Sequence, residues 1–129
     1  MNIYGIGTDI VDNNRIKHLI KKKNFLNRVF SKKEIKFSKN TKNKIFYFSK
    51  RFAAKEAFVK SLGIGFRHGI NLNEISVLND NKGKPYFYLN RNIKSVIKHV
   101  CKIKKFKCHL SLSDEKKHSL SYVVLERIK

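Results

Sequence analysis

Residues 51–60 of this chain read Arg-Phe-Ala-Ala-Lys-Glu-Ala-Phe-Val-Lys and form the middle of a predicted helix over residues 45–62. The run is rich in alanine, lysine and glutamate, which are strong helix formers. Four apolar residues fall on one arc at 100° per residue and predict a buried stripe: Phe48, Phe52, Val59 and Leu62. Gly63 and Gly65 follow directly and predict the end of the helix. We expect the rest of the chain to be organised around this helix.

Three charged residues of this helix are candidates for chemistry. Glu56 and Lys60 are four residues apart, so a carboxylate and an ammonium point the same way from the edge of the stripe. On most helices such a pair is an ordinary surface bridge worth about 0.2–0.5 kcal/mol. Lys55 is less ordinary, because it projects into the apolar arc, where a lysine must reach water or meet an anion. That position favours a functional role.

The length of 129 residues suits one domain, residues 1–129, with a single core. The apolar runs are too short to cross a membrane, and the N-terminus does not resemble a signal peptide. We therefore expect a soluble, cytoplasmic protein with no membrane partner. Cys101 and Cys108 match neither a zinc site nor a disulfide framework, so we expect both thiols to be reduced.

The formal net charge of +21 raises the question of nucleic acid. Two further origins of this charge compete with nucleic-acid binding. Lysine, asparagine, isoleucine and phenylalanine are abundant together, which is typical of an AT-rich coding sequence. An anionic substrate or an acidic protein partner would also be attracted by such a charge. Charge alone does not choose between these hypotheses.

Residues 2–11 predict a first strand, because β-branched residues alternate there with glycine. Gly5, Gly7 and Asp9 share one face, and the glycines leave room for another group to approach. An ionised Asp9 in a mainly apolar strand is costly unless a cation or hydrogen-bond donors meet it. A helix cap is the alternative role, but Asp12 is better placed for it. We therefore favour Asp9 as a ligand.

The remaining pattern predicts short helices and two hairpins. A helix is expected over residues 13–22, followed by a hydrophobic elbow at 25–30. Ser31 and Glu34 have the spacing of a capping box and predict a second short helix through residue 37. Strands are expected at 75–78, 86–89, 109–113 and 119–125, with a helix over 93–100. This order predicts an α+β fold, with an antiparallel sheet packed against a long central helix and shorter helices.

The strand at 109–113 separates an apolar row from a polar row that contains His109, Ser111 and Ser113. Such a polar row is most often the solvated face of an antiparallel sheet. His109 gains functional interest only if Asp9 and Glu56 lie close to it.

Four motifs of the chain occur in a characteristic order. They are Gly-Ile-Gly-Thr-Asp-Ile-Val-Asp at 5–12 with Arg15, Arg-Phe-Ala-Ala-Lys-Glu-Ala at 51–57 with Lys60, Gly-Lys-Pro at 83–85, and His-Leu-Ser-Leu-Ser-Asp-Glu at 109–115. Together they resemble the bacterial holo-[acyl-carrier-protein] synthases, the short class of 4'-phosphopantetheinyl transferases, over nearly the whole chain. One departure is Ile64, where the family often has threonine, and it puts only a hydroxyl contact in doubt.

The resemblance implies transfer of 4'-phosphopantetheine from coenzyme A to a serine of apo acyl carrier protein, in support of fatty acid biosynthesis. Adenosine 3',5'-bisphosphate is the other product. Asp9 and Glu56 would hold Mg²⁺ against the pyrophosphate. Lys60 would stabilise or protonate the leaving phosphate, and Lys55 would be a further anion contact. The serine proton would pass to Glu56 or to a metal-bound water, and this choice stays open.

The resemblance also implies partners. His109 would contact phosphate or substrate, without being a metal ligand, and Arg15 and Lys22 would meet the acidic carrier protein. The short family members are homotrimers with active sites at subunit interfaces. Four residues would thus act on the coenzyme of a neighbouring subunit: Lys42, Lys44, Lys84 and Pro85.

Two alternatives remain beside the enzyme. A small basic nucleic-acid-binding protein would use cations and exposed aromatic residues, and would not need Asp9, Glu56 and His109 between apolar runs. The leading hypothesis expects no nucleic-acid partner. A family member that has lost its activity would keep the fold without the metal.

Overall fold

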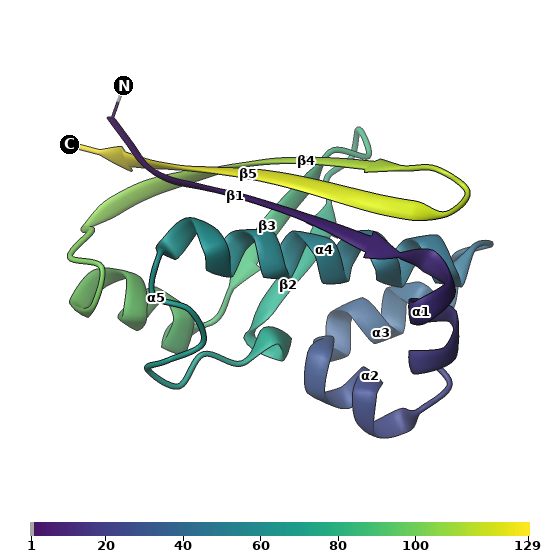
Figure 1. Cartoon of the computed structure of the whole chain (residues 1–129). Coiled ribbons are helices and arrows are strands. Elements are labelled where there is room, and N and C mark those ends of the chain that lie inside the picture. Colours follow the sequence, from purple (N-terminus) through teal and green to yellow (C-terminus); the bar gives the residue numbers. More distant parts are fainter. Residues whose placement is uncertain (1) are drawn as a thin grey trace.

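A 19-residue helix, α4 (Lys44–Leu62), runs through the middle of the structure, which is a computed structural model and describes residues 2–129 (Figure 1). A three-stranded antiparallel sheet covers one side of α4, in the order β1 (Asn2–Asp12), β5 (His118–Ile128) and β4 (Lys105–Asp114). A second, two-stranded sheet pairs β2 (Ile75–Asn79) with β3 (Pro85–Leu89). These layers confirm the expected α+β fold.

Five shorter helical segments complete the fold. Three lie beside the N-terminal half of α4 in Figure 1: α1 (Asn13–Leu19), α2 (Lys23–Val29) and α3 (Lys32–Ser38). The short 3₁₀ helix η1 (Leu72–Glu74) precedes β2, and α5 (Arg91–His99) packs near the C-terminal end of α4. None of the helices within residues 2–129 combines the length and apolar character needed to cross a bilayer.

The boundaries of α4 follow from its caps. The Asn43 side chain accepts a hydrogen bond from the Phe46 amide at 3.0 Å, which satisfies a free N–H of the first turn. Gly63 ends the helix in the left-handed region, with φ of 76°. The predicted helix end is therefore confirmed.

The apolar stripe predicted on α4 is buried in full, since Phe48, Phe52, Val59 and Leu62 are at most 8% exposed. The burial extends further round the helix than the stripe predicts. Alanines 53, 54 and 57 are completely buried, and their small side chains let neighbouring elements approach closely. The helix is enclosed because sheets and short helices pack on several sides of it.

Two glycines of β1 lie directly on the α4 backbone. A Cβ atom at Gly5 would stand 2.0 Å from the Ser61 carbonyl oxygen, and one at Gly7 would stand 1.8 Å from the Ala57 carbonyl oxygen. The group for which these glycines leave room is therefore α4 itself. This close packing sets the position of Asp9, two residues further along the same face of β1.

The short helices differ in part from the expectation. The capping box is confirmed, because Ser31 N donates to Glu34 Oε1 at 2.9 Å and Glu34 N donates to Ser31 Oγ at 3.3 Å. The helix expected over residues 13–22 is wrong in length, since it ends at Leu19 and a separate helix, α2, begins at Lys23. The elbow expected at 25–30 is mostly this second helix, which buries Phe25 and Val29 at helical spacing.

Glu74 links the segment before β2 to the start of α5. Its carboxylate accepts hydrogen bonds from the backbone or side chains of three asparagines: Asn71, Asn90 and Asn92. Burial alone would raise the pKa of Glu74, but these hydrogen bonds together outweigh it and lower the pKa. The ionised form is therefore the one that the fold stabilises.

Both predicted hairpins are confirmed, with longer strands than expected. Alternate side chains of β1 and β5 point away from α4, and we call this surface the outer sheet face. Its exposed apolar residues include Ile3, Ile6, Ile10, Leu120 and Tyr122. No part of the described chain lies over this face (Figure 1). The solvated polar row expected on β4 is confirmed, since His109, Ser111 and Ser113 are exposed at one edge of the sheet.

Candidate active site

Asp9 and Lys60 meet at the contact between β1 and α4. Lys60 Nζ lies 3.2 Å from Asp9 Oδ1 and donates to the Thr8 carbonyl oxygen at 3.0 Å. The Lys60 side chain is 55% exposed, so its ammonium stays accessible to a ligand. The glycine contacts of β1 with α4 bring these two residues together from positions 51 residues apart.

Glu56 belongs to the same cluster. Burial raises the pKa of the Glu56 carboxyl, the negative charge of Asp9 raises it further, and the charges of Lys60 and Arg15 oppose the rise. The two carboxylates are therefore close enough to repel each other. The Arg15 guanidinium, 6.0 Å from the centre of the Phe52 ring, reaches α4 from α1.

These side chains fit a magnesium ion better than an all-protein metal cage. Within residues 2–129 no group of three or more His, Cys, Asp or Glu side chains is arranged to hold a metal. Mg²⁺ usually takes one or two carboxylates from the protein and completes its shell with water and substrate phosphates. A divalent cation beside Asp9 and Glu56 would offset the negative charge of Asp9 that, after burial, raises the pKa of Glu56.

Lys55 does not face this cluster. Its Nζ is fully buried, forms an ion pair with Glu34, and donates to the carbonyl oxygens of Val29 at 2.7 Å and Leu72 at 3.2 Å. The prediction that Lys55 contacts coenzyme A is therefore wrong for this structure, because all three ammonium hydrogens are used internally. The expectation that it meets an anion is confirmed, and the anion is Glu34.

His109 lies on β4, and the structure does not bring it to Asp9 and Glu56 within one chain. Its Nε2 is 2.9 Å from Glu126 Oε1 on the outer sheet face. Asp9 is on β1, at the other edge of the sheet. A histidine so placed would approach Asp9 and Glu56 only across a contact between two chains.

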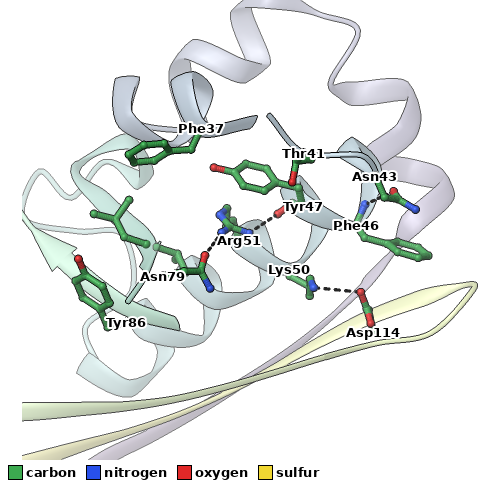
Figure 2. Close-up of a pocket in the computed structure, with 12 residues that line it drawn as sticks. Phe37, Thr41, Asn43, Phe46, Tyr47, Lys50, Arg51, Asn79, Tyr86 and Asp114 are labelled. Carbon is green, nitrogen blue, oxygen red and sulfur yellow. Dashed lines mark hydrogen bonds and ion pairs between the residues drawn. The ribbon is translucent and has the colours of Figure 1, made fainter. Parts of the chain in front are cut away.

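A pocket of about 670 Å³ lies between the start of α4, the α3–α4 loop and the second sheet (Figure 2). Arg51 stands beside Tyr47 in the middle of it, with Phe37 and Tyr86 to one side and Lys50 to the other. The Arg51 guanidinium is 3.6 Å from the Tyr47 ring centre.

Arg51 is the functional candidate that the sequence pattern did not reveal. It is 7% exposed, and it donates to the Tyr47 carbonyl oxygen at 3.2 Å and to Asn79 Oδ1 at 2.6 Å. Its Nε has no hydrogen-bond partner, and no carboxylate within residues 2–129 forms an ion pair with it. A buried cation without a counter-charge favours an anionic ligand. No local sequence signal marks Arg51, because it directly follows Lys50 and reads as part of a charged helix surface.

The residues predicted to act on a neighbour's coenzyme lie around this Arg51 pocket. Lys42 and Lys44 are exposed on either side of Asn43, which lines the pocket. Pro85, directly after the exposed Lys84, lines an adjoining hollow between Arg51 and β4. All four therefore lie toward the β4 edge, whereas Asp9 lies at the β1 edge.

Arg15 and Lys22 are both exposed in the short-helix region. Arg15 lies toward Glu56, as its lowering effect on the pKa of that carboxyl indicates. Lys22 precedes α2 and lines a shallow hollow with Lys23 and Arg28. A cationic surface therefore adjoins the cluster on the side of α1 and α2.

Comparison with known proteins places this geometry in a family. The model of the 4'-phosphopantetheinyl transferase superfamily matches residues 5–123. The chain is 50% identical over 127 residues to the holo-[acyl-carrier-protein] synthase of Pelagibacter ubique (strain HTCC1062), covering 98% of this chain and 99% of that protein. It is 44% identical to the synthase of Wolbachia pipientis subsp. Culex pipiens (strain wPip), covering 95% and 97%.

Solved structures agree. The crystal structure of the synthase from Neisseria meningitidis superposes with a TM-score of 0.87 at 36% identity, covering 97% of this chain and 99% of that one. The synthase from Bacillus anthracis str. Ames, solved in complex with CoA (3',5'-ADP), gives a TM-score of 0.81 at 31% identity, covering 99% and 100%. The chain therefore belongs to the 4'-phosphopantetheinyl transferase superfamily, and within it to the holo-[acyl-carrier-protein] synthases.

Proposed function

We propose that this protein transfers 4'-phosphopantetheine from coenzyme A to a serine hydroxyl of apo acyl carrier protein, releasing adenosine 3',5'-bisphosphate. The observation that carries the proposal is the meeting of Asp9, Glu56 and Lys60 in a chain of this family. Family membership favours this activity over a small basic nucleic-acid-binding protein. The substrates suit a cytoplasmic enzyme that supplies fatty acid biosynthesis.

Asp9 and Glu56 would hold Mg²⁺ in the working enzyme. The ion would neutralise negative charge on the pyrophosphate oxygens of coenzyme A. The raised pKa of Glu56, caused first by burial and then by the negative charge of Asp9, supports this assignment because a cation beside the two carboxylates would favour the ionised form of Glu56.

Lys60 and Glu56 would handle charge and protons. The Lys60 ammonium, which is exposed although it also contacts Asp9 and Thr8, would bind the leaving phosphate and stabilise the charge that develops on it. Glu56 would also be the carboxylate of this cluster that accepts the proton of the carrier serine.

The Arg51 pocket would bind another anionic part of the coenzyme. The Arg51 pocket of one subunit would serve the coenzyme held at the Asp9 cluster of its neighbour. Within one chain the Arg51 pocket adjoins the β4 edge of the sheet, while Asp9 lies at the β1 edge. Two chains side by side would bring one edge to the other. The homotrimer that the family resemblance implies would offer such seams, and the exposed apolar side chains of the outer sheet face favour self-association.

Arg15 and Lys22 would meet the acidic carrier protein next to the metal cluster. Both are exposed, and the net charge of +21 would speed encounter with an acidic partner. Such steering weakens as salt rises, because the Debye length is only about 8–10 Å near 0.1–0.15 M.

The activity is tested by incubating the protein with apo acyl carrier protein, coenzyme A and Mg²⁺, and by weighing the carrier with mass spectrometry. We expect the carrier to gain one phosphopantetheine. Asp9→Asn and Glu56→Gln should each lower turnover by about 100-fold or more. Glu115→Gln, at an exposed carboxylate, is the matched control and should behave like wild type. A carrier of unchanged mass would refute the proposed function.

The shared site is tested by mixing two inactive variants. Arg51→Met would damage the coenzyme pocket and Glu56→Gln the metal cluster, so each homotrimer alone should be inactive. After subunit exchange, some seams would combine an intact pocket with an intact cluster, and activity should return. Light scattering that gives a fully active monomer, or mixing that restores no activity, would contradict the shared site.

A further inference from the structure

Glu34 and Lys55 form a buried polar unit that the proposed reaction does not use. Both side chains are completely inaccessible to solvent. Besides binding Lys55, Glu34 Oε1 accepts from Ser31 N at 2.9 Å, and Oε2 accepts from Val77 N at 2.9 Å. The Lys55 ammonium has three acceptors, and the Phe30 ring centre lies 4.9 Å from it. The unit is therefore saturated and leaves no donor for a substrate.

The unit joins five elements. Its partners are the C-terminus of α2, the first turn of α3, the middle of α4, the 3₁₀ helix η1 and strand β2. The Tyr47 hydroxyl also donates to the Glu34 carbonyl oxygen at 2.6 Å. Helices α1, α2 and α3 have seven residues each, too few to be stable alone, so their placement depends on tertiary contacts.

A buried ion pair of this kind contributes little to the free energy of unfolding compared with apolar side chains in the same place. Apolar residues of similar volume often stabilise a protein as well or better, because the charges must be taken out of water. The pair instead fixes the relative positions of neighbouring elements, since each of its hydrogen bonds holds one backbone group in place relative to α4. Burial, the largest cause, lowers the pKa of Lys55 to about 8, although the Glu34 charge opposes it.

We infer that Glu34 and Lys55 are positioning residues that set how residues 13–38, here called the helical lobe, dock on α4, and thereby fix Arg15 relative to Glu56. The inference rests on the proposed function, in which Arg15 faces the carrier. Arg15 lies on α1 of the helical lobe and reaches Phe52, one turn before Glu56 on α4. A shift of the lobe would therefore move the carrier-facing cation away from the reacting groups.

The decisive variant is Glu34→Leu/Lys55→Met, which removes both charges and keeps most of the buried volume. Lys98→Met, at an exposed lysine of α5, is the matched control. Thermal unfolding, calorimetric binding of coenzyme A, kcat, and KM for both substrates are measured on wild type, on these two variants, and on the single variants Lys55→Met and Glu34→Gln. We expect the double variant to unfold cooperatively, to bind coenzyme A within about threefold of wild type, and to raise KM for the carrier at least about tenfold. Lys98→Met should match wild type throughout.

The outcomes separate positioning from other roles. A residue needed only for folding would reduce the active fraction, lowering kcat while both KM values stay unchanged, and would overturn the inference. A Lys55 that contacts the coenzyme would make Lys55→Met weaken coenzyme binding, while Glu34→Gln would leave binding intact. If neither the double variant nor the single variants fold, the pair is a folding requirement and the inference also fails. Wild-type protein without any transfer would instead refute the proposed function.

Discussion

Replacing Gly7 by alanine tests whether the contact of β1 with α4 builds the active site. The added Cβ would stand 1.8 Å from the Ala57 carbonyl oxygen, 2.8 Å from its carbonyl carbon and 3.0 Å from Ser61 N. Carbon atoms rarely approach other heavy atoms closer than 3.0 Å, so β1 must withdraw by at least 3.0 minus 1.8, about 1.2 Å. The neighbouring atoms belong to a helix backbone and cannot escape by changing rotamer.

Overpacking of a core costs about 1–3 kcal/mol, and the rigid backbone neighbours put Gly7→Ala at the upper end, about 3 kcal/mol. For a chain of this size that corresponds to a fall in Tm of roughly 10 °C. Asp9 is two residues further on the same strand and face, and a displacement of about 1 Å at a catalytic group costs about 100-fold in rate. We therefore expect Gly7→Ala to lose both stability and turnover.

Circular dichroism melting and single-turnover transfer to apo carrier measure the two effects. Gly69→Ala is the control, because its Cβ would have no neighbour within 4 Å although its φ of 74° makes the backbone strained. It should cost about 1–2 kcal/mol and leave turnover unchanged. Gly7→Ala with a Tm within about 2 °C of wild type would refute the tight contact. A large fall in Tm with normal turnover would show that the contact does not position Asp9.

Three further substitutions follow from the charges and hydrogen bonds. Glu56→Gln should lose turnover but should be more stable than wild type to urea at pH 7. The pKa of Glu56 is raised in the folded state, so the stability that its neutral form provides below the unfolded pKa is lost as pH rises through the folded pKa. A variant less stable than wild type would contradict that sign. Glu74→Gln should cost about 1 kcal/mol at pH 7. Because the folded pKa of Glu74 is lowered, this loss should shrink as pH falls through that pKa, and a loss independent of pH in urea unfolding would refute it. Tyr47→Phe removes a buried hydroxyl that donates at 2.6 Å to the Glu34 carbonyl oxygen, and should cost about 1–3 kcal/mol in thermal unfolding; no loss would mean that this bond is replaced.

The sequence alone identified the features that depend on residues near one another in the chain. The α4 helix, its end at Gly63 and the capping box of Ser31 with Glu34 follow from spacings of a few residues, and the structure has all of them. The hairpins follow from alternation and turn residues in the same way. The second short helix, α2, was not predicted, because Phe25 and Val29 form only one helical repeat, which is too short to distinguish a helix from a loop.

Part of the candidate site was also predictable. Asp9 was singled out because a carboxylate in an apolar strand needs a cation, and Glu56 and Lys60 because they share one side of a helix. That Asp9 and Lys60 lie 3.2 Å apart depends on the packing of β1 against α4 through Gly5 and Gly7. The two glycines predicted that another group approaches β1 closely, but they did not predict which element it is.

Only the tertiary structure decided the partners of the buried cations. Lys55 had to meet an anion, and nine acidic residues were available in the sequence, but the packing of the short helices selected Glu34. Arg51 is buried beside a pocket and forms no ion pair with a carboxylate of residues 2–129, which the local spacing of residues does not indicate. Helix caps and periodicity are local and can be read from the chain, whereas the partner of a buried charge depends on which distant elements pack around it.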